Sequence, residues 1–175
     1  AGGIQVQSGT LSLNGGGSSN ASGFFAAPGA MLQFGTPAAG SAGTFTFNGG
    51  LYTVASTQIT GGTVDFAGAA AVGFTESLSG SDGAVQLGTL SAAAHTFSLT
   101  DGGTLSGSGF FSVNSIATLG AGLQTGAGVT VLAGPSSVGT GAEIDGGRIV
   151  QNTGTLAWSG GTLTLGGGDT ALSLH

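Results

Sequence analysis

The most regular feature of the chain is a four-residue phrase: a threonine, a large apolar residue, any residue, and a second large apolar residue. Alternation with a period of two residues predicts β-strands that are buried on one face. The threonine and the middle residue then face outward, and the two apolar side chains face the core. The phrase occurs at residues 10–13, 44–47, 63–66, 96–99, 155–158 and 162–165.

Pairs of glycines separate many of these strands, often with Asn or Asp in front. Glycine adopts positive φ without strain, and Asn and Asp tolerate it best among the other residues, so the pairs predict sharp corners. Their spacing suits coils of roughly 20 residues. The pairs are Gly49-Gly50, Gly61-Gly62, Gly102-Gly103, Gly146-Gly147 and Gly160-Gly161.

Short strands joined by such corners predict an all-β fold, a parallel β-helix or β-solenoid with Gly-rich corners. We expect about eight coils, a rod near 40 Å long and a single domain over residues 1–175. The Ala-rich stretches at 67–72 and 92–94 lack the caps and length of a stable helix. An antiparallel sandwich is the alternative, because hairpins also use Asn-Gly and Asp-Gly turns. The short strands and the repeated phrase favour the solenoid.

The segment 139–168 carries a family resemblance. Its core reads Ile-Asp-Gly-Gly-Arg-Ile-Val-Gln-Asn-Thr-Gly-Thr-Leu-Ala-Trp-Ser-Gly-Gly-Thr-Leu-Thr-Leu from residue 144, and residues 102–122 are phrased similarly. This resembles the β-strand repeats of large bacterial surface exoproteins, such as filamentous-haemagglutinin-like adhesins and autotransporter passengers. The resemblance implies a right-handed β-helix, secretion, and an adhesive or structural role. It implies no catalytic residue, because such proteins share a scaffold rather than a site.

Composition narrows the classes of function. The chain has 39 glycines and only 5% charged residues, with Arg148 as the one basic residue beside seven carboxylates. A net charge of −6 leaves nothing to neutralise phosphates, so we expect neither nucleic acid nor an acidic membrane surface as a partner. No apolar run is long enough for a membrane helix, and we expect no membrane insertion. The 39% of hydrophobic residues argues against disorder.

We predict that the chain is not an enzyme, and assign no catalytic, cofactor-binding or metal-binding residue. The alternative is a carbohydrate-active β-helix, a polysaccharide lyase or hydrolase, in which Asp65, Asp82 and Asp101 stack on one face as paired acids. Asp precedes the glycines, unlike the calcium-binding nonapeptide, so only weak calcium binding at clustered carboxylates remains open. The two histidines, His95 and His175, have no partner ligands nearby in sequence for zinc, and His95 is expected at a corner before a strand.

Aromatic and threonine positions suggest two kinds of surface. We expect Phe45, Phe47, Phe66 and Phe97 to stack in the core, and one member of each pair Phe24-Phe25 and Phe110-Phe111 to be exposed. Outward threonines could form a flat ice-binding array, a further alternative. Other copies of the phrase replace the second threonine by Ser12, Asp65, Ser98 or Ala157, which disfavours a regular array.

We therefore expect an extracellular, cell-surface segment with a structural or adhesive role. The chain begins with Ala1 rather than Met, which favours a mature protein or an excised piece. Residues 1–4 and 171–174 carry no charged or helical cap, so we expect either a longer parent chain or end-to-end stacking into a homo-oligomer or filament. Low charge favours lateral contact as well. Outward hydroxyl and amide groups suit weak contact with carbohydrate or a host surface.

Overall fold

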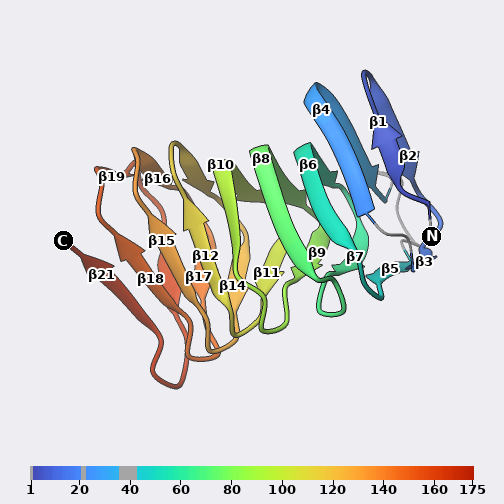
Figure 1. The fold of residues 1–175 in the computed structure, drawn as a ribbon. Coiled ribbons are helices and arrows are strands. Elements are labelled where there is room, and N and C mark those ends of the chain that lie inside the picture. The colour runs from blue at the N-terminus through green and yellow to red at the C-terminus, as the bar shows by residue number, and fades with distance from the viewer. Residues whose placement is uncertain (1, 21–22, 36–42) are drawn as a thin grey trace.

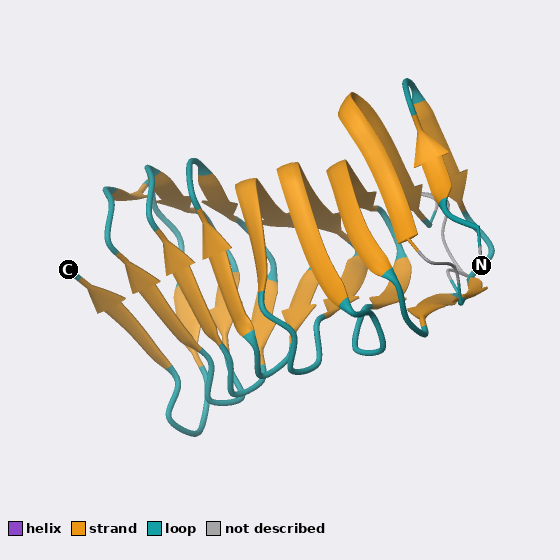
Figure 2. Cartoon of the chain, in the orientation of Figure 1, coloured by secondary structure: helices purple, strands orange, loops and turns teal. Residues whose placement is uncertain are grey.

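The strands wind into a stack of coils with three faces. The computed structural model describes residues 2–20, 23–35 and 43–175; Ala1, expected to form part of the N-terminal end, lies outside them. Within these residues all regular structure is β-strand and every printed strand pairing is parallel (Figure 2). No helix there could cross a membrane. The all-β solenoid prediction is confirmed, and the antiparallel sandwich is wrong.

Face 1 carries the first strand segment of each coil. Its four long strands bend onto face 2 without a break. The strands of face 1 are β1 (Ile4–Val6), the first parts of β4 (Gly23–Phe34), β6 (Leu51–Ile59), β8 (Ala71–Ser81) and β10 (Ala92–Thr100), then β12 (Phe110–Val113), β15 (Val129–Leu132), β18 (Ile149–Asn152) and β21 (Ala171–Leu174).

Faces 2 and 3 complete each coil. Face 2 is formed by β2 (Thr10–Leu13), the second parts of the long strands, β13 (Ala117–Leu119), β16 (Ser136–Val138) and β19 (Leu156–Trp158). Face 3 is a separate sheet of β3 (Gly17–Ser19), β5 (Thr44–Phe47), β7 (Gly62–Asp65), β9 (Gly83–Gln86), β11 (Thr104–Ser106), β14 (Leu123–Thr125), β17 (Ala142–Ile144) and β20 (Leu163–Leu165).

The register fixes the length of a coil. Ile4 pairs with Phe24, Tyr52 with Val72 and Phe111 with Thr130, so a coil takes 19 or 20 residues. About eight such coils are stacked. Figure 1 shows face 1 toward the viewer, with the N-terminal end on the right and the C-terminal end on the left. The chain ascends on this face, passes backward over the upper edge and advances leftward, which is the right-handed sense.

The long strands differ from the short ones that were expected. In coils two to five the chain turns from face 1 to face 2 inside a strand, at a shift of register such as that between Val54 and Ser56. In later coils Gly, Pro and Ser residues break the same corner into a loop, as at Gly134 and Pro135. The corner before face 3 uses positive φ, which Asp82 (54°) and Asp101 (50°) adopt as non-glycine residues. The expected role of Asp at corners is thus confirmed at two coils.

The core changes character along the rod. Its N-terminal half is aromatic: Phe47 stacks on Phe66 with ring centroids 4.9 Å apart, and Tyr52 packs edge-on against Phe66 at 4.8 Å. Phe97 is also buried, whereas Phe45 is only half-buried. The expected core aromatics therefore face inward. The Tyr52 hydroxyl lies 2.7 Å from that of buried Thr57, and burial raises the pKa of Tyr52 well above its usual range.

The C-terminal half of the core contains a buried cation. Arg148 is fully buried, and its guanidinium donates from Nε to the Thr125 carbonyl (3.0 Å), from Nη1 to the Thr130 hydroxyl (3.0 Å) and from Nη2 to the Gly107 carbonyl (3.1 Å). The Thr130 hydroxyl in turn contacts the Gln124 amide oxygen at 2.8 Å. These bonds join Arg148 to the two preceding coils. Burial lowers the pKa of Arg148 to about 10.

Candidate interaction surfaces

The three aspartates proposed as paired acids do not share one site. Asp82 and Asp101 stack on neighbouring coils, and the Asp82 amide donates to the Asp101 carbonyl at 3.0 Å. Asp65 lies at the far end of β7, because Gly62 rather than Asp65 pairs with Gly83. Four residues of strand place Asp65 about 13 Å along from the Asp82 corner. Its carboxylate accepts instead from the Ala67 amide at 2.9 Å, closing a local turn.

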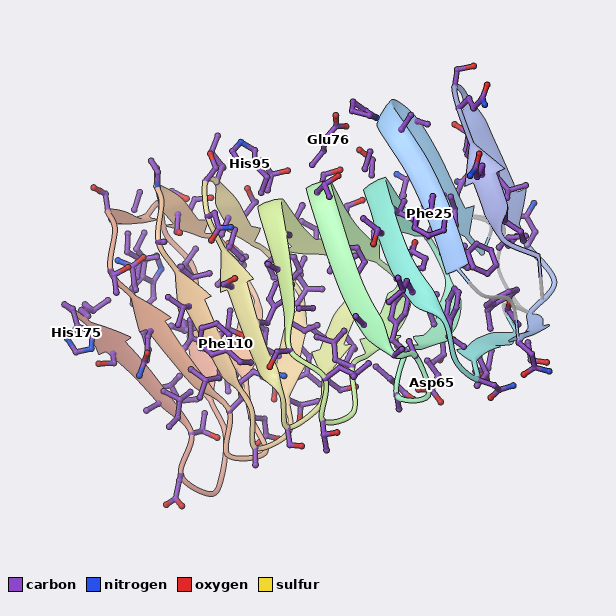
Figure 3. All side chains as sticks on the ribbon, viewed as in Figure 1. Phe25, Asp65, Glu76, His95, Phe110 and His175 are labelled. Carbon is purple, nitrogen blue, oxygen red and sulfur yellow. The ribbon has the colours of Figure 1, made fainter. Side chains whose placement is uncertain are left out.

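The corner between faces 1 and 2 gathers polar groups without forming a metal cluster. Figure 3 shows Glu76 and His95 on this upper edge. The Glu76 carboxylate accepts from the Gly29 amide (3.2 Å) and the Ser56 hydroxyl (3.3 Å), so it connects three coils. His95 is exposed and lines a shallow pocket of about 280 Å³. Across the described residues, no three His, Asp or Glu side chains are placed to hold a metal ion.

The histidine positions differ partly from expectation. His95 lies inside β10, where that strand bends over the corner, and not before a strand. The corner placement itself is correct. His175 is exposed, and its Nε2 lies 3.0 Å from the Ser173 hydroxyl.

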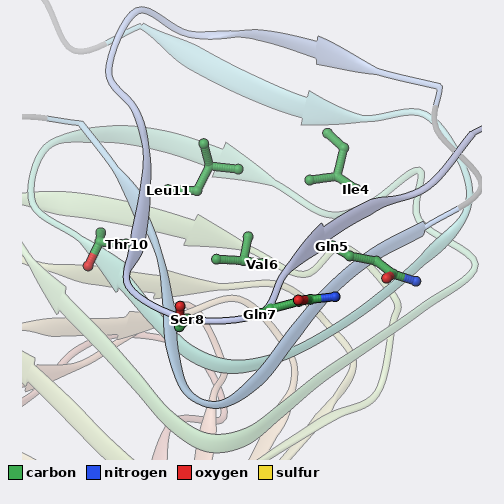
Figure 4. Close-up of a pocket in the computed structure, with 7 residues that line it drawn as sticks. All are labelled: Ile4, Gln5, Val6, Gln7, Ser8, Thr10 and Leu11. Atoms are coloured by element: carbon green, nitrogen blue, oxygen red, sulfur yellow. The ribbon is translucent and has the colours of Figure 1, made fainter.

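The N-terminal end of the rod is an open apolar hollow. Strands β1 and β2 pair with β4 on one side only, which leaves their other backbone edges free of a neighbouring strand in the described structure. Ile4 and Leu11 stack directly on buried Phe24 and Leu32. The hollow measures about 430 Å³ and is lined by Ile4, Gln5, Val6, Gln7, Ser8, Thr10 and Leu11 (Figure 4).

The C-terminal end is open in the same way. Trp158 stacks on buried Val138, and Leu165 stacks on buried Ile144, so both side chains occupy core positions. They are nevertheless 55% and 50% exposed, because β19 and β20 pair with a neighbouring strand on one side only. The sequence pattern predicted that these residues face the core, which is correct, and that the core covers them, which is wrong.

Face 2 presents a row of neutral hydrogen-bonding groups. One outward position of each coil is aligned along the rod, and the Ser12 hydroxyl donates to the Gln33 amide oxygen at 3.2 Å. We call this row the hydroxyl row. It consists of Ser12, Gln33, Gln58, Ser79, Ser98, Thr118 and Ser137.

Threonines line up instead on face 3, but the row is broken. Thr44, Thr63 and Thr104 occupy one outward position there, while Ala84, Leu123 and Glu143 occupy the same position in other coils. A flat threonine array is therefore not formed, as the irregular phrase predicted.

Sequence reasoning missed the surface made by the side chain of Phe25. Burial separates the two phenylalanine pairs as expected: Phe24 and Phe111 are buried, whereas Phe25 and Phe110 are 39% and 44% exposed. Figure 3 shows Phe25 and Phe110 on the same broad face of the rod. The alternation of the sequence predicted their exposure, but only the register between coils places them on one surface.

Comparisons with protein families, with curated proteins and with solved structures found no match to this chain. The fold and its surfaces therefore carry the functional argument.

Proposed function

We propose that the chain is a structural segment of an extracellular, adhesive surface fibre, and that its coils stack end to end on further coils of the same kind. The observation that carries this proposal is the pair of open ends, where core side chains and backbone edges meet solvent. Ile4, Trp158 and Leu165 are each more than one third exposed although they occupy core positions. A further coil placed on either end would cover them and pair the free edges.

The two ends are chemically suited to each other. The N-terminal hollow is bordered by Ile4, Val6 and Leu11, and the opposite end presents Trp158, Leu165 and Leu174. Both strand layers run parallel, so a second rod added in the same direction continues the parallel ladders at a spacing of about 4.8 Å. Neither set contains a charged side chain, and stacking therefore desolvates no ion.

The adhesive part of the proposal is supported by the hydroxyl row on face 2. Ser, Thr and Gln side chains both donate and accept hydrogen bonds, as sugar hydroxyls do. Each contact of this kind is weak, but repetition along a fibre multiplies them. A glycan array tests this part: neutral glycans should bind the wild-type chain, and Ser79→Asp should weaken that binding while Ser112→Asp on face 1 leaves it unchanged. Equal binding by all three chains would contradict it.

End-to-end stacking is tested by sedimentation velocity on the purified chain. The wild-type chain should form species larger than one rod, in proportions that rise with concentration. Leu165→Asp places a carboxylate on the open end and should reduce these species to single rods. Thr164→Asp is the matched control, because Thr164 lies next to Leu165 on the same strand but faces outward. A wild-type chain that sediments as single rods at every concentration refutes the proposal.

A further inference from the structure

We propose that face 1 packs laterally against face 1 of a second copy of this chain, through a row of apolar side chains along the outside of the rod. The row, called here the apolar stripe, consists of Phe25, Leu51, Ala71, Phe110, Val129 and Ile149. This contact is distinct from the end-to-end stacking proposed above, because it uses the flank of the rod.

The register of the coils assembles the stripe. Leu51 pairs with Ala71 on neighbouring strands, and Phe110, Val129 and Ile149 follow one another in the same way. Ser91, the exposed residue before β10, lies between the two groups because the next residue, Ala92, pairs with Phe111. The stripe therefore runs along nearly the whole flank, with one serine near its middle.

Phe25 joins the stripe although its own position lies two residues away. The residue of that coil that pairs with Leu51 is Gly23. A Cβ atom on Gly23 would lie only 2.7 Å from Cε2 of Phe25, and one on Gly3 would lie 3.8 Å from the same atom. The aromatic ring thus covers both glycines and fills the place in the stripe that they leave empty.

The strands beneath the stripe are apolar on both sides. In β15 the outward residues Val129 and Val131 flank Thr130, and Leu132 is buried. In β18 outward Ile149 precedes buried Val150. Strands of parallel sheets that are apolar on both sides are typical of sheets covered on both faces. The core covers one side of face 1, and we infer that a partner covers the other.

Charge identifies the partner as a second copy. The described outward positions of the face 1 strands carry no ionisable side chain up to the corner with Glu76 and His95. The carboxylates of Asp65, Glu143 and Asp145 project from face 3 or its ends. Two chains of net charge −6 repel each other, least so when these carboxylates point away from the contact. Packing face 1 on face 1 achieves this, and the contact is self-complementary, as a two-fold interface requires.

The available area suits a weak dimer. Nine strand positions spaced about 4.8 Å apart give a flank near 40 Å long, and four residues of strand give a width of about 13 Å. Each copy therefore contributes about 500 Å², and a pair buries about 1,000 Å², the lower limit for a specific interface. Two aligned sheets would pack about 10 Å apart with their side chains between them.

The first test is chemical crosslinking with single cysteines, which the cysteine-free chain makes unambiguous. Ser91→Cys places a thiol in the middle of the apolar stripe, and Ser98→Cys places one in the hydroxyl row as the matched control. A short bismaleimide should join Ser91→Cys into covalent dimers and leave Ser98→Cys monomeric. End-to-end stacking cannot produce this product, because Ser91 lies several coils from either end. Equal crosslinking of both variants, or of neither, overturns the proposal.

The second test measures lateral affinity by sedimentation equilibrium in chains that also carry Leu165→Asp, which blocks end-to-end growth. Phe110→Asp should raise the dimer dissociation constant at least about tenfold, because pairing would bury two unpaired carboxylates. Ser98→Asp, with the same change in charge, should leave the constant unchanged. Phe110 is exposed, so folding should persist, which circular dichroism checks. A Leu165→Asp chain that stays monomeric, or a dimer indifferent to Phe110→Asp, overturns lateral pairing without touching end-to-end stacking.

Discussion

Replacing Arg148 by lysine should destabilise the C-terminal half of the rod more than replacing it by methionine. The three guanidinium nitrogens reach acceptors on Gly107, Thr125 and Thr130, which no single ammonium group can contact together. Lysine keeps the buried charge and loses most of its partners. Methionine is similar in length, carries no charge, and packs well in irregular apolar spaces.

The magnitude follows from the bonds that are lost. A hydrogen bond to a charged group contributes about 1.5–3 kcal/mol, and lysine loses at least two of the three, so Arg148→Lys should cost about 3–5 kcal/mol. Arg148→Met leaves the carbonyls of Gly107 and Thr125 without this donor, at about 1–3 kcal/mol each. It also removes the cost of burying a cation, so its net loss should be about 1–3 kcal/mol.

Urea denaturation followed by circular dichroism compares the free energies of unfolding of the two variants. Native-state hydrogen exchange locates the effect, because stability in a solenoid is local to neighbouring coils. Protection should fall in β14, β15 and β18 and persist in β6 and β8. A lysine variant that is as stable as wild type, or more stable than the methionine variant, would refute this account of the buried cation.

Two further predictions concern the core and the coil spacing. Tyr52→Phe should cost about 1 kcal/mol at neutral pH, because Thr57 loses its hydroxyl partner. The raised pKa of Tyr52 means that the folded state keeps its proton, so this group's contribution is complete below about pH 10 and is lost at higher pH. Arg148 acts in the opposite direction above pH 10; with no lysine present, pH titration of unfolding should show Tyr52→Phe resisting alkali better than wild type. Gly109→Ala should cost about 1–3 kcal/mol in the same assay, because a Cβ there collides with the carbonyl oxygen of Leu90. Gly167→Ala, with open space around it, should change stability little, and equal effects at the two glycines would contradict the tight stacking of coils.

The sequence predicts the coil well because the alternation is local. Val64 with Phe66, and Phe97 with Leu99, alternate with polar residues in the sequence and are buried as expected. The continuous corners of β6 and β10 were missed, although both segments contain no glycine, which could have signalled an unbroken strand.

Placement between coils was harder to predict because it depends on small differences in coil length. Asp82 and Asp101 are 19 residues apart, which matches one coil, so they stack. Asp65 and Asp82 are 17 residues apart, which is short of the 21-residue register between Gly62 and Gly83. The two aspartates therefore lie at opposite ends of their strands. Burial of Arg148 could not be inferred at all, since its partners are backbone carbonyls and a hydroxyl without a motif.

The central claim, that the chain is a rod that elongates through its open ends, is tested most directly by electron microscopy of the purified chain. The account predicts filaments whose 4.8 Å strand spacing continues across the junctions between copies. Separate particles about 40 Å long, at concentrations where Leu165→Asp and wild type look the same, would contradict it.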